Sequence, residues 1–111
     1  MLQPAADEDF NVFYKAPSVI IVSADESAIT PQLDSALAMG NMFLAASSMG
    51  IGSCWIHAMA RLFESDEGTS FKEELCMPAG YKVFAAGVFG YPSGDIPEPA
   101  PRKEGTVDII K

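Results

Sequence analysis

The longest apolar pattern in the chain predicts a long helix that ends in a tight turn. Thr30 and Pro31 suit the cap and the first position of a helix, and Gly50 and Gly52 are residues at which helices commonly stop. Apolar or small residues recur at the spacing of one helical face, at Leu33, Leu37, Gly40 and Leu44. We expect this stripe to be buried.

The remaining surface of the same helix is also largely apolar. It carries Ala38, Met39, Met42, Ala45, Ala46 and Met49. A helix that is apolar nearly all round must be covered on both sides. In a chain of 111 residues, we expect the second cover to come from outside the chain.

Two apolar runs predict strands that are buried on both faces. Residues 18–23 follow Ala16-Pro17 as a β-branched run without polar alternation, and residues 81–90 form a second run rich in small residues. The compact segment at residues 54–56 follows the long helix. The expected class is therefore α+β, with a mixed sheet flanked by helices.

The segment between these strands predicts short helices. Residues 59–63 favour a helical turn, and residues 64–69 favour a solvated loop. Ser70 and Glu73 have the spacing of a capping box and predict a short helix that ends by Pro78.

The two ends of the chain differ from the middle. Residues 1–11 are acidic and are expected to be a flexible lead-in, which leaves residues 12–111 as a single domain. Residues 93–101 are rich in proline and predict irregular structure. Residues 106–110 are enough for a short edge strand, either within this chain or on a partner's sheet.

Charge excludes several classes of partner. The net charge is −8 and the seven Lys and Arg residues are scattered, which disfavours nucleic acid and anionic membranes. No unbroken apolar run of about 18 residues and no signal segment is present, so we expect no membrane partner and a cytoplasmic location.

The residue types offer little side-chain chemistry. His57 is the single histidine, which argues against a catalytic triad or a histidine-based metal site, and no nucleotide-binding glycine motif is present. Cys54 and Cys76 lack metal-ligand spacing. We interpret them as reduced cysteines that pack as small hydrophobic residues; the alternative is a disulfide or a redox pair. The sequence therefore predicts no catalytic side chain and no metal.

The order of three motifs along the chain says more about function than the single residue types do. The helix end AASSMGIGSCWI at residues 45–56 is followed by MPAGY at residues 77–81 and GVFGYP at residues 87–92. Together with the strand after Ala16-Pro17, this order resembles the FMN-dependent nitroreductase family from Phe13 to the end of the chain. Only the C-terminal half of such a protein is represented, so the resemblance implies an incomplete nitroreductase-like fold.

The resemblance implies a cofactor site made of two parts. Backbone N–H groups of the turn at Trp55, Ile56, His57 and Ala58 would donate hydrogen bonds to the FMN ring. Arg102 and Lys103 would bind the FMN phosphate, Arg102 better because its planar fork holds two phosphate oxygens. The alternative is that these two exposed basic residues bind nothing.

The resemblance also implies partners and a reaction. NAD(P)H would be the electron donor, and a nitroaromatic, quinone or similar small molecule the acceptor. The helix from Thr30 to Ser48 would pack in a homodimer, in which small residues such as Ala38, Ala45 and Ala46 allow close approach.

The N-terminal half of the family is not represented before Phe10. The chain is then either a fragment or truncated product of a normal enzyme, or a shortened relative whose missing half comes from another chain. The alternative function is a catalytically silent, acidic dimerisation or interaction domain that does not bind flavin alone.

Overall fold

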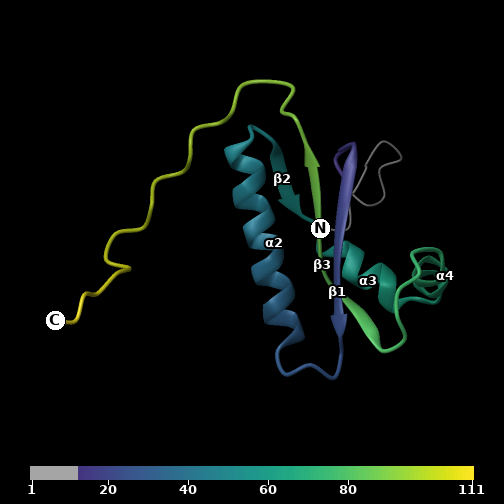
Figure 1. Cartoon of the computed structure of the whole chain (residues 1–111). Helices are drawn as coiled ribbons and strands as arrows, with labels where there is room; N and C mark the ends of the chain where they lie inside the picture. The colour runs from purple at the N-terminus through teal and green to yellow at the C-terminus, as the bar shows by residue number, and fades with distance from the viewer. Residues whose placement is uncertain (1–12) are drawn as a thin grey trace.

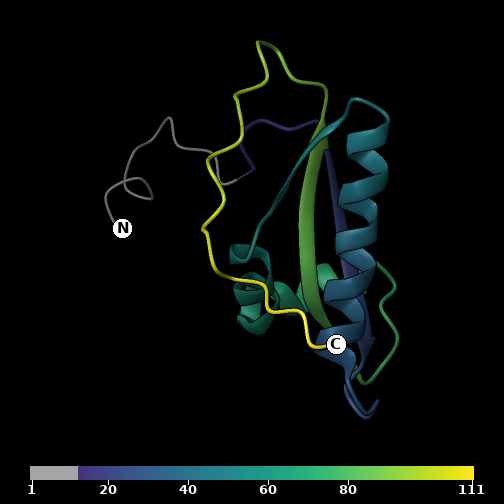
Figure 2. The same cartoon turned by 90° about the vertical axis from the view of Figure 1, so that its left-hand side faces the viewer.

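A three-stranded antiparallel sheet lies between helices on its two faces (Figures 1 and 2). The computed structural model describes residues 13–111, so the expected lead-in at residues 1–11 lies outside the described part. The elements are β1 (Ser18–Asp25), α2 (Pro31–Ser48), β2 (Gly52–Trp55), α3 (Ala58–Glu64), α4 (Asp66–Glu74) and β3 (Tyr81–Gly90). The order in the sheet is β1-β3-β2. The expected α+β class is confirmed, and the sheet of the described residues is antiparallel throughout rather than mixed.

Helix α2 begins and ends at the residues that the sequence indicates. Pro31 is its first residue, and the chain leaves the helix through Gly50, whose φ of 72° favours glycine. The expected side-chain cap is wrong: the Thr30 hydroxyl donates to Oδ1 of Asp34 at 3.2 Å instead of accepting a backbone hydrogen bond. The helix start therefore depends on Pro31 and on the Asp34 carboxylate near the positive end of the dipole.

The face of α2 that packs on the sheet is not the one the spacing favoured. Ser35, Met39 and Ala46 are buried, whereas the leucines of the predicted stripe are 65–71% exposed: Leu33, Leu37 and Leu44. The face of α2 with methionine and alanine packs on the sheet because the helix and the sheet approach each other closely there. The prediction that one apolar face of this helix lacks cover within the chain is consistent with the exposed leucines.

Strand β3 supplies the core on both faces of the sheet. Ala85 and Phe89 pack under α2 in a cluster with Met39 and Ala46. On the opposite face, β3 residues pack with α3 and the segment before it in a cluster of Ile56, Met59, Phe63, Val83, Ala86 and Val88. The prediction of a strand buried on both faces is confirmed for β3.

A bulge in β3 allows both clusters to form. Val22 of β1 pairs with Ala85 and the next residue, Ser23, pairs with Val83, so Phe84 has no partner in β1. One extra residue shifts the alternation of side chains by one position. As a result, Val83 and Ala86 both face α3.

Strand β1 is less covered than the sequence predicts. Its first residues are exposed and Ile21 and Val22 are only partly buried, because β1 is an edge strand in the described chain. At its end, the Ser27 backbone N–H and hydroxyl donate to Oδ1 of Asp25 at 2.9 and 2.7 Å. These hydrogen bonds lower the pKa of Asp25 and fix the turn toward α2.

Helix α4 begins earlier than expected. The predicted loop at residues 64–69 and the predicted cap at Ser70 are wrong, since Ser65 is the cap and its hydroxyl accepts from the Gly68 N–H at 3.4 Å. A Cβ on Gly68 would collide with the backbone of Phe63 at 2.5 Å, so glycine lets α3 and α4 pack end to end. The helical turn expected at residues 59–63 is confirmed as part of α3.

The C-terminal segment, residues 91–111, leaves the end of β3, passes the end of α2 and extends away from that helix (Figure 1). All of its residues are exposed and none is in a strand. The irregular structure expected at residues 93–101 is confirmed. The strand expected at residues 106–110 does not form within the chain, since no described strand lies beside it to accept its hydrogen bonds.

We predict that Gly87→Val destabilises the fold by about 1–3 kcal/mol, because a side chain there overpacks the interface between β3 and α2. A Cβ on Gly87 would lie 2.9 Å from Sδ of Met39 and 2.9 Å from Cε1 of Phe43. Chemical denaturation followed by far-UV circular dichroism measures the change. The matched control is Gly94→Val, where a Cβ meets nothing within 4 Å. Equal effects of the two substitutions would contradict close packing at Gly87.

Candidate functional site

The turn expected at the flavin ring connects β2 to α3. Trp55 ends β2 and is half-buried, and the Ile56 side chain is 5% exposed within the core cluster under α3. The Ile56 N–H donates to the Ala86 carbonyl at 2.9 Å. His57 and Ala58 are exposed; His57 is the N-cap residue of α3 and Ala58 is its first residue. Ile56 thus anchors the turn to the central strand from both its backbone and its side chain.

Two adjacent backbone N–H groups at this turn are free. Within residues 13–111, neither His57 N–H nor Ala58 N–H has a hydrogen-bond partner, whereas the next N–H, of Met59, donates to the Ile56 carbonyl. His57 has helical φ and ψ of −69° and −26°, which aims consecutive N–H groups in similar directions. Unpaired, exposed N–H groups of this kind can donate to an acceptor atom of a bound ligand.

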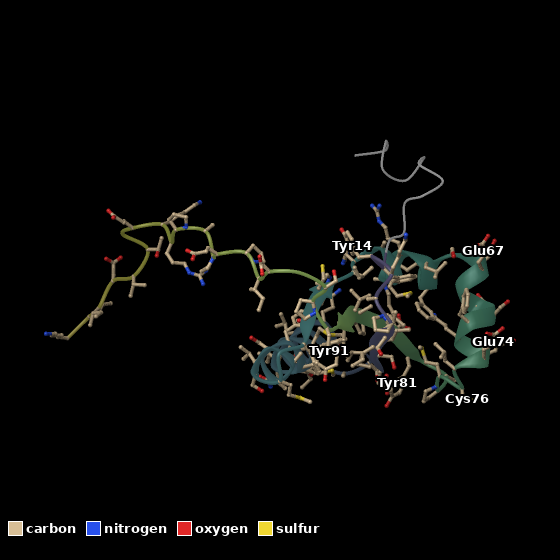
Figure 3. The ribbon with its side chains drawn as sticks, turned by 90° about the horizontal axis from the view of Figure 1, so that it is seen from above. Tyr14, Glu67, Glu74, Cys76, Tyr81 and Tyr91 are labelled. Atoms are coloured by element: carbon tan, nitrogen blue, oxygen red, sulfur yellow. The ribbon has the colours of Figure 1, made fainter. Side chains whose placement is uncertain are left out.

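The expected phosphate-binding residues lie apart from this turn. Arg102 and Lys103 are exposed in the C-terminal segment, which extends from Tyr91 away from α4 (Figure 3). The one side-chain hydrogen bond in that segment joins the Thr106 hydroxyl to the Lys103 carbonyl at 3.4 Å. Within a single chain, the structure therefore brings the four turn residues together but does not bring the two cations to them.

A cavity of about 430 Å³ borders the turn. Trp55 and His57 contribute to its wall, together with residues of the first turns of α2, of α3 and of the first half of β3: Gln32, Ala36, Ala60, Arg61, Glu64, Lys82, Val83 and Phe84. Nζ of Lys82 lies 3.2 Å from Oε1 of Glu64 and 6.0 Å from the centre of the Phe84 ring. The volume lies in the range of small-molecule sites.

Sequence reasoning did not single out Arg61, Lys82 or Phe84. The spacing of His57, Arg61 and Glu64 places them on one face of α3, and this helical spacing was an available signal. Lys82 and Phe84 come from β3, so no local pattern connects them with α3.

Both cysteines are free thiols, as the reduced reading predicts. They are exposed rather than packed as small hydrophobic residues, so that part of the expectation is wrong. Cys54 lies at the surface of β2 and Cys76 follows α4 with a positive φ of 54°.

Residues 13–111 contain neither a candidate metal-binding cluster nor a helix that could span a membrane. No group of three or more His, Cys, Asp or Glu side chains in that range is arranged to hold a metal ion. No helix in that range has the length and apolar character needed to cross a membrane.

Comparison with models of protein families identifies the family of this chain. The model of the nitroreductase family matches residues 4–91. No curated protein sequence matches the chain significantly.

Solved structures resemble the chain over almost its whole length. A nitroreductase with bound FMN from Bacteroides fragilis NCTC 9343 is 32% identical, with a TM-score of 0.85, over 98% of this chain and 59% of that chain. Iodotyrosine deiodinase bound to FMN and 3-iodo-L-tyrosine is 25% identical, with a TM-score of 0.62, over 96% of this chain and 54% of that chain.

A nitroreductase with bound FMN from Desulfitobacterium hafniense DCB-2 shares the fold at 24% identity. Its TM-score is 0.77, and the match covers 95% of this chain and 63% of that chain. The chain thus spans about 60% of the length of the first two nitroreductases.

Proposed function

The chain belongs to the nitroreductase family, and on that premise we propose that it forms the C-terminal half of the FMN site of an NAD(P)H oxidoreductase. The acceptors are nitroaromatics, quinones or similar small molecules, and the reaction takes place in the cytoplasm. The observation that carries the proposal is the two N–H groups of His57 and Ala58, which have no hydrogen-bond partner within residues 13–111 and lie at the turn that the family resemblance assigns to the flavin ring. Two of the solved nitroreductases with this fold contain bound FMN.

The protein's part in this reaction is to position the reactants. FMN, when bound, supplies the hydride and electron transfer between NAD(P)H and the acceptor. The His57 and Ala58 N–H groups would donate to the ring, and the buried Ile56 side chain would hold them in place. In this proposal no side chain of the turn, His57 included, has to act as a nucleophile or a strong base.

We propose that the second half of the site comes from another chain. Arg102 and Lys103 would bind the FMN phosphate, and their exposed segment is separate from the turn of the same chain. A homodimer through the helix from Thr30 to Ser48 would bring a second C-terminal segment close. The exposed leucines of α2 support this interface, and the segment at residues 106–110 would pair with the partner's sheet.

The alternative function is a silent dimerisation domain that binds no flavin. It is supported by the separation of Arg102 and Lys103 from the turn, and by the part of the matched structures, about 40% of their length, that this chain does not cover.

We expect the purified chain to show a bound flavin absorbance band after FMN is added, together with a dimeric mass. Arg102→Ala should weaken FMN binding about tenfold or more, because a charge-assisted hydrogen bond to phosphate is lost. Equilibrium titration followed by FMN fluorescence measures the affinity. The matched control is Lys72→Ala on α4, which removes a cation far from the C-terminal segment.

The outcomes separate the two functions. Absence of flavin binding at any FMN concentration would favour the silent domain. Equal affinities of the wild type and Arg102→Ala would remove Arg102 from the phosphate site and leave the turn as the flavin contact.

Leu37→Asp and Leu44→Asp should each raise the dimer dissociation constant by about a hundredfold or more, because an unpaired charge would be buried in the interface. The side chains are 70% and 71% exposed in the single chain, so helix content should be retained. Sedimentation and far-UV circular dichroism test the two effects separately. Thr69→Asp on α4 adds the same charge at another exposed helical position and is the control. An unchanged mass in both leucine variants would contradict the proposed interface.

A further inference from the structure

The cavity beside the turn lies where the sheet has an open edge. In the described part of the chain, strand β2 pairs with Gly87 to Gly90 of β3 and runs beside one half of that strand (Figure 1). The chain then turns at Ile56 into α3, so no described strand covers the β2 side of residues 81–85. The cavity of about 430 Å³ lies at this uncovered side of β3, between the first turns of α2 and helix α3.

The charge of the cavity wall is opposite to that of the whole chain. The chain has a net charge of −8 and seven basic residues, yet Arg61, Lys82 and the single histidine, His57, all line this cavity. Among the described residues, 13–111, Glu64 is the one acidic residue of the wall, and it is paired with Lys82 at 3.2 Å. The Arg61 guanidinium has no ion-pair or hydrogen-bond partner within residues 13–111. It is therefore the group that is free to bind an anion.

The cavity also carries two aromatic side chains. Trp55 and Phe84 are both half-buried, so their rings are held by the fold while part of each ring remains accessible. Aromatic side chains prefer offset or edge contacts with another ring. Arginine binds a carboxylate with two parallel hydrogen bonds because its planar fork matches the two oxygens. The wall is therefore suited to a ligand with a planar ring and an attached carboxylate.

We propose that this cavity binds aromatic carboxylates, with the carboxylate on Arg61 and the ring between Trp55 and Phe84. The proposal names the acceptor class of the proposed oxidoreductase and rests on that function, since Trp55 and His57 belong both to the turn and to the cavity wall. Glu64 opposes the ligand charge and limits the affinity. Uncharged aromatic compounds of the same shape bind more weakly.

The test uses the full chain and its single tryptophan, Trp55, as the reporter. Quenching of Trp55 fluorescence is titrated with 4-nitrobenzoate and with its neutral analogue 4-nitrobenzamide, which corrects for quenching that does not depend on charge. We expect 4-nitrobenzoate to bind at least about tenfold more tightly than 4-nitrobenzamide, in line with a charge-assisted pair.

Three substitutions test the assignment of the residues. Arg61→Gln should abolish the preference for the carboxylate, and Glu64→Gln should increase it several-fold, because the negative charge of an acidic wall residue is removed. Lys72→Gln on α4 is the control and should leave the preference unchanged. Far-UV circular dichroism verifies that each variant is folded. Equal affinities for the two compounds in the wild type, or an unchanged preference in Arg61→Gln, would overturn the proposal.

Two further measurements identify the source of the anion and separate this proposal from the proposed function. Displacement of 4-nitrobenzoate by inorganic phosphate at equal concentration would overturn the carboxylate assignment and identify a phosphate site. FMN binding without a carboxylate preference would overturn only the inference about the cavity. A carboxylate preference in a chain that binds no FMN would overturn the assignment of the ligand as a flavin acceptor.

Discussion

The close packing of α2 against β3 is the contact on which the remaining structure depends. Gly87 has no side chain where Met39 and Phe43 approach within 2.9 Å of a Cβ position, and Met39 is completely buried there. Because β3 is the central strand, the same residues fix the position of β1 on one side and of β2 on the other. The turn after β2 is attached to β3 by the Ile56 N–H, so the geometry of the candidate site follows from this helix-to-strand contact.

The bulge at Phe84 and the short length of β2 together produce the cavity. The bulge lets β3 present apolar side chains to both helical layers. Because the chain leaves the sheet at Ile56, no strand of the described residues pairs with the first half of β3 on the β2 side. Polar and charged side chains at such an edge are common because they discourage pairing with other strands. Here the Lys82–Glu64 pair is located at the open edge, and beside it Arg61 has no ion-pair partner within residues 13–111.

Elements bounded by proline and glycine were predictable from the sequence. Pro31 and Gly50 mark the ends of α2, and the apolar run of β3 matches its strand residue for residue. The packed face of α2 was not predictable, because both faces are apolar and the choice depends on the close approach at Gly87. The cap of α4 was assigned to Ser70 by local spacing, whereas Ser65 is used because Gly68 lets α4 pack against α3.

For the candidate site, the family resemblance located the continuous turn at residues 55–58, but no local sequence pattern could connect that turn with residues of β3.

The C-terminal segment links any flavin binding by the chain to the association of two chains. Its residues are all exposed, and fixing them costs conformational entropy that contacts with a second chain must offset. Where a cofactor needs groups from two chains, binding and association are linked equilibria. For such a site, the occupancy at a fixed FMN concentration falls as the protein itself is diluted, so the flavin content reports the degree of assembly.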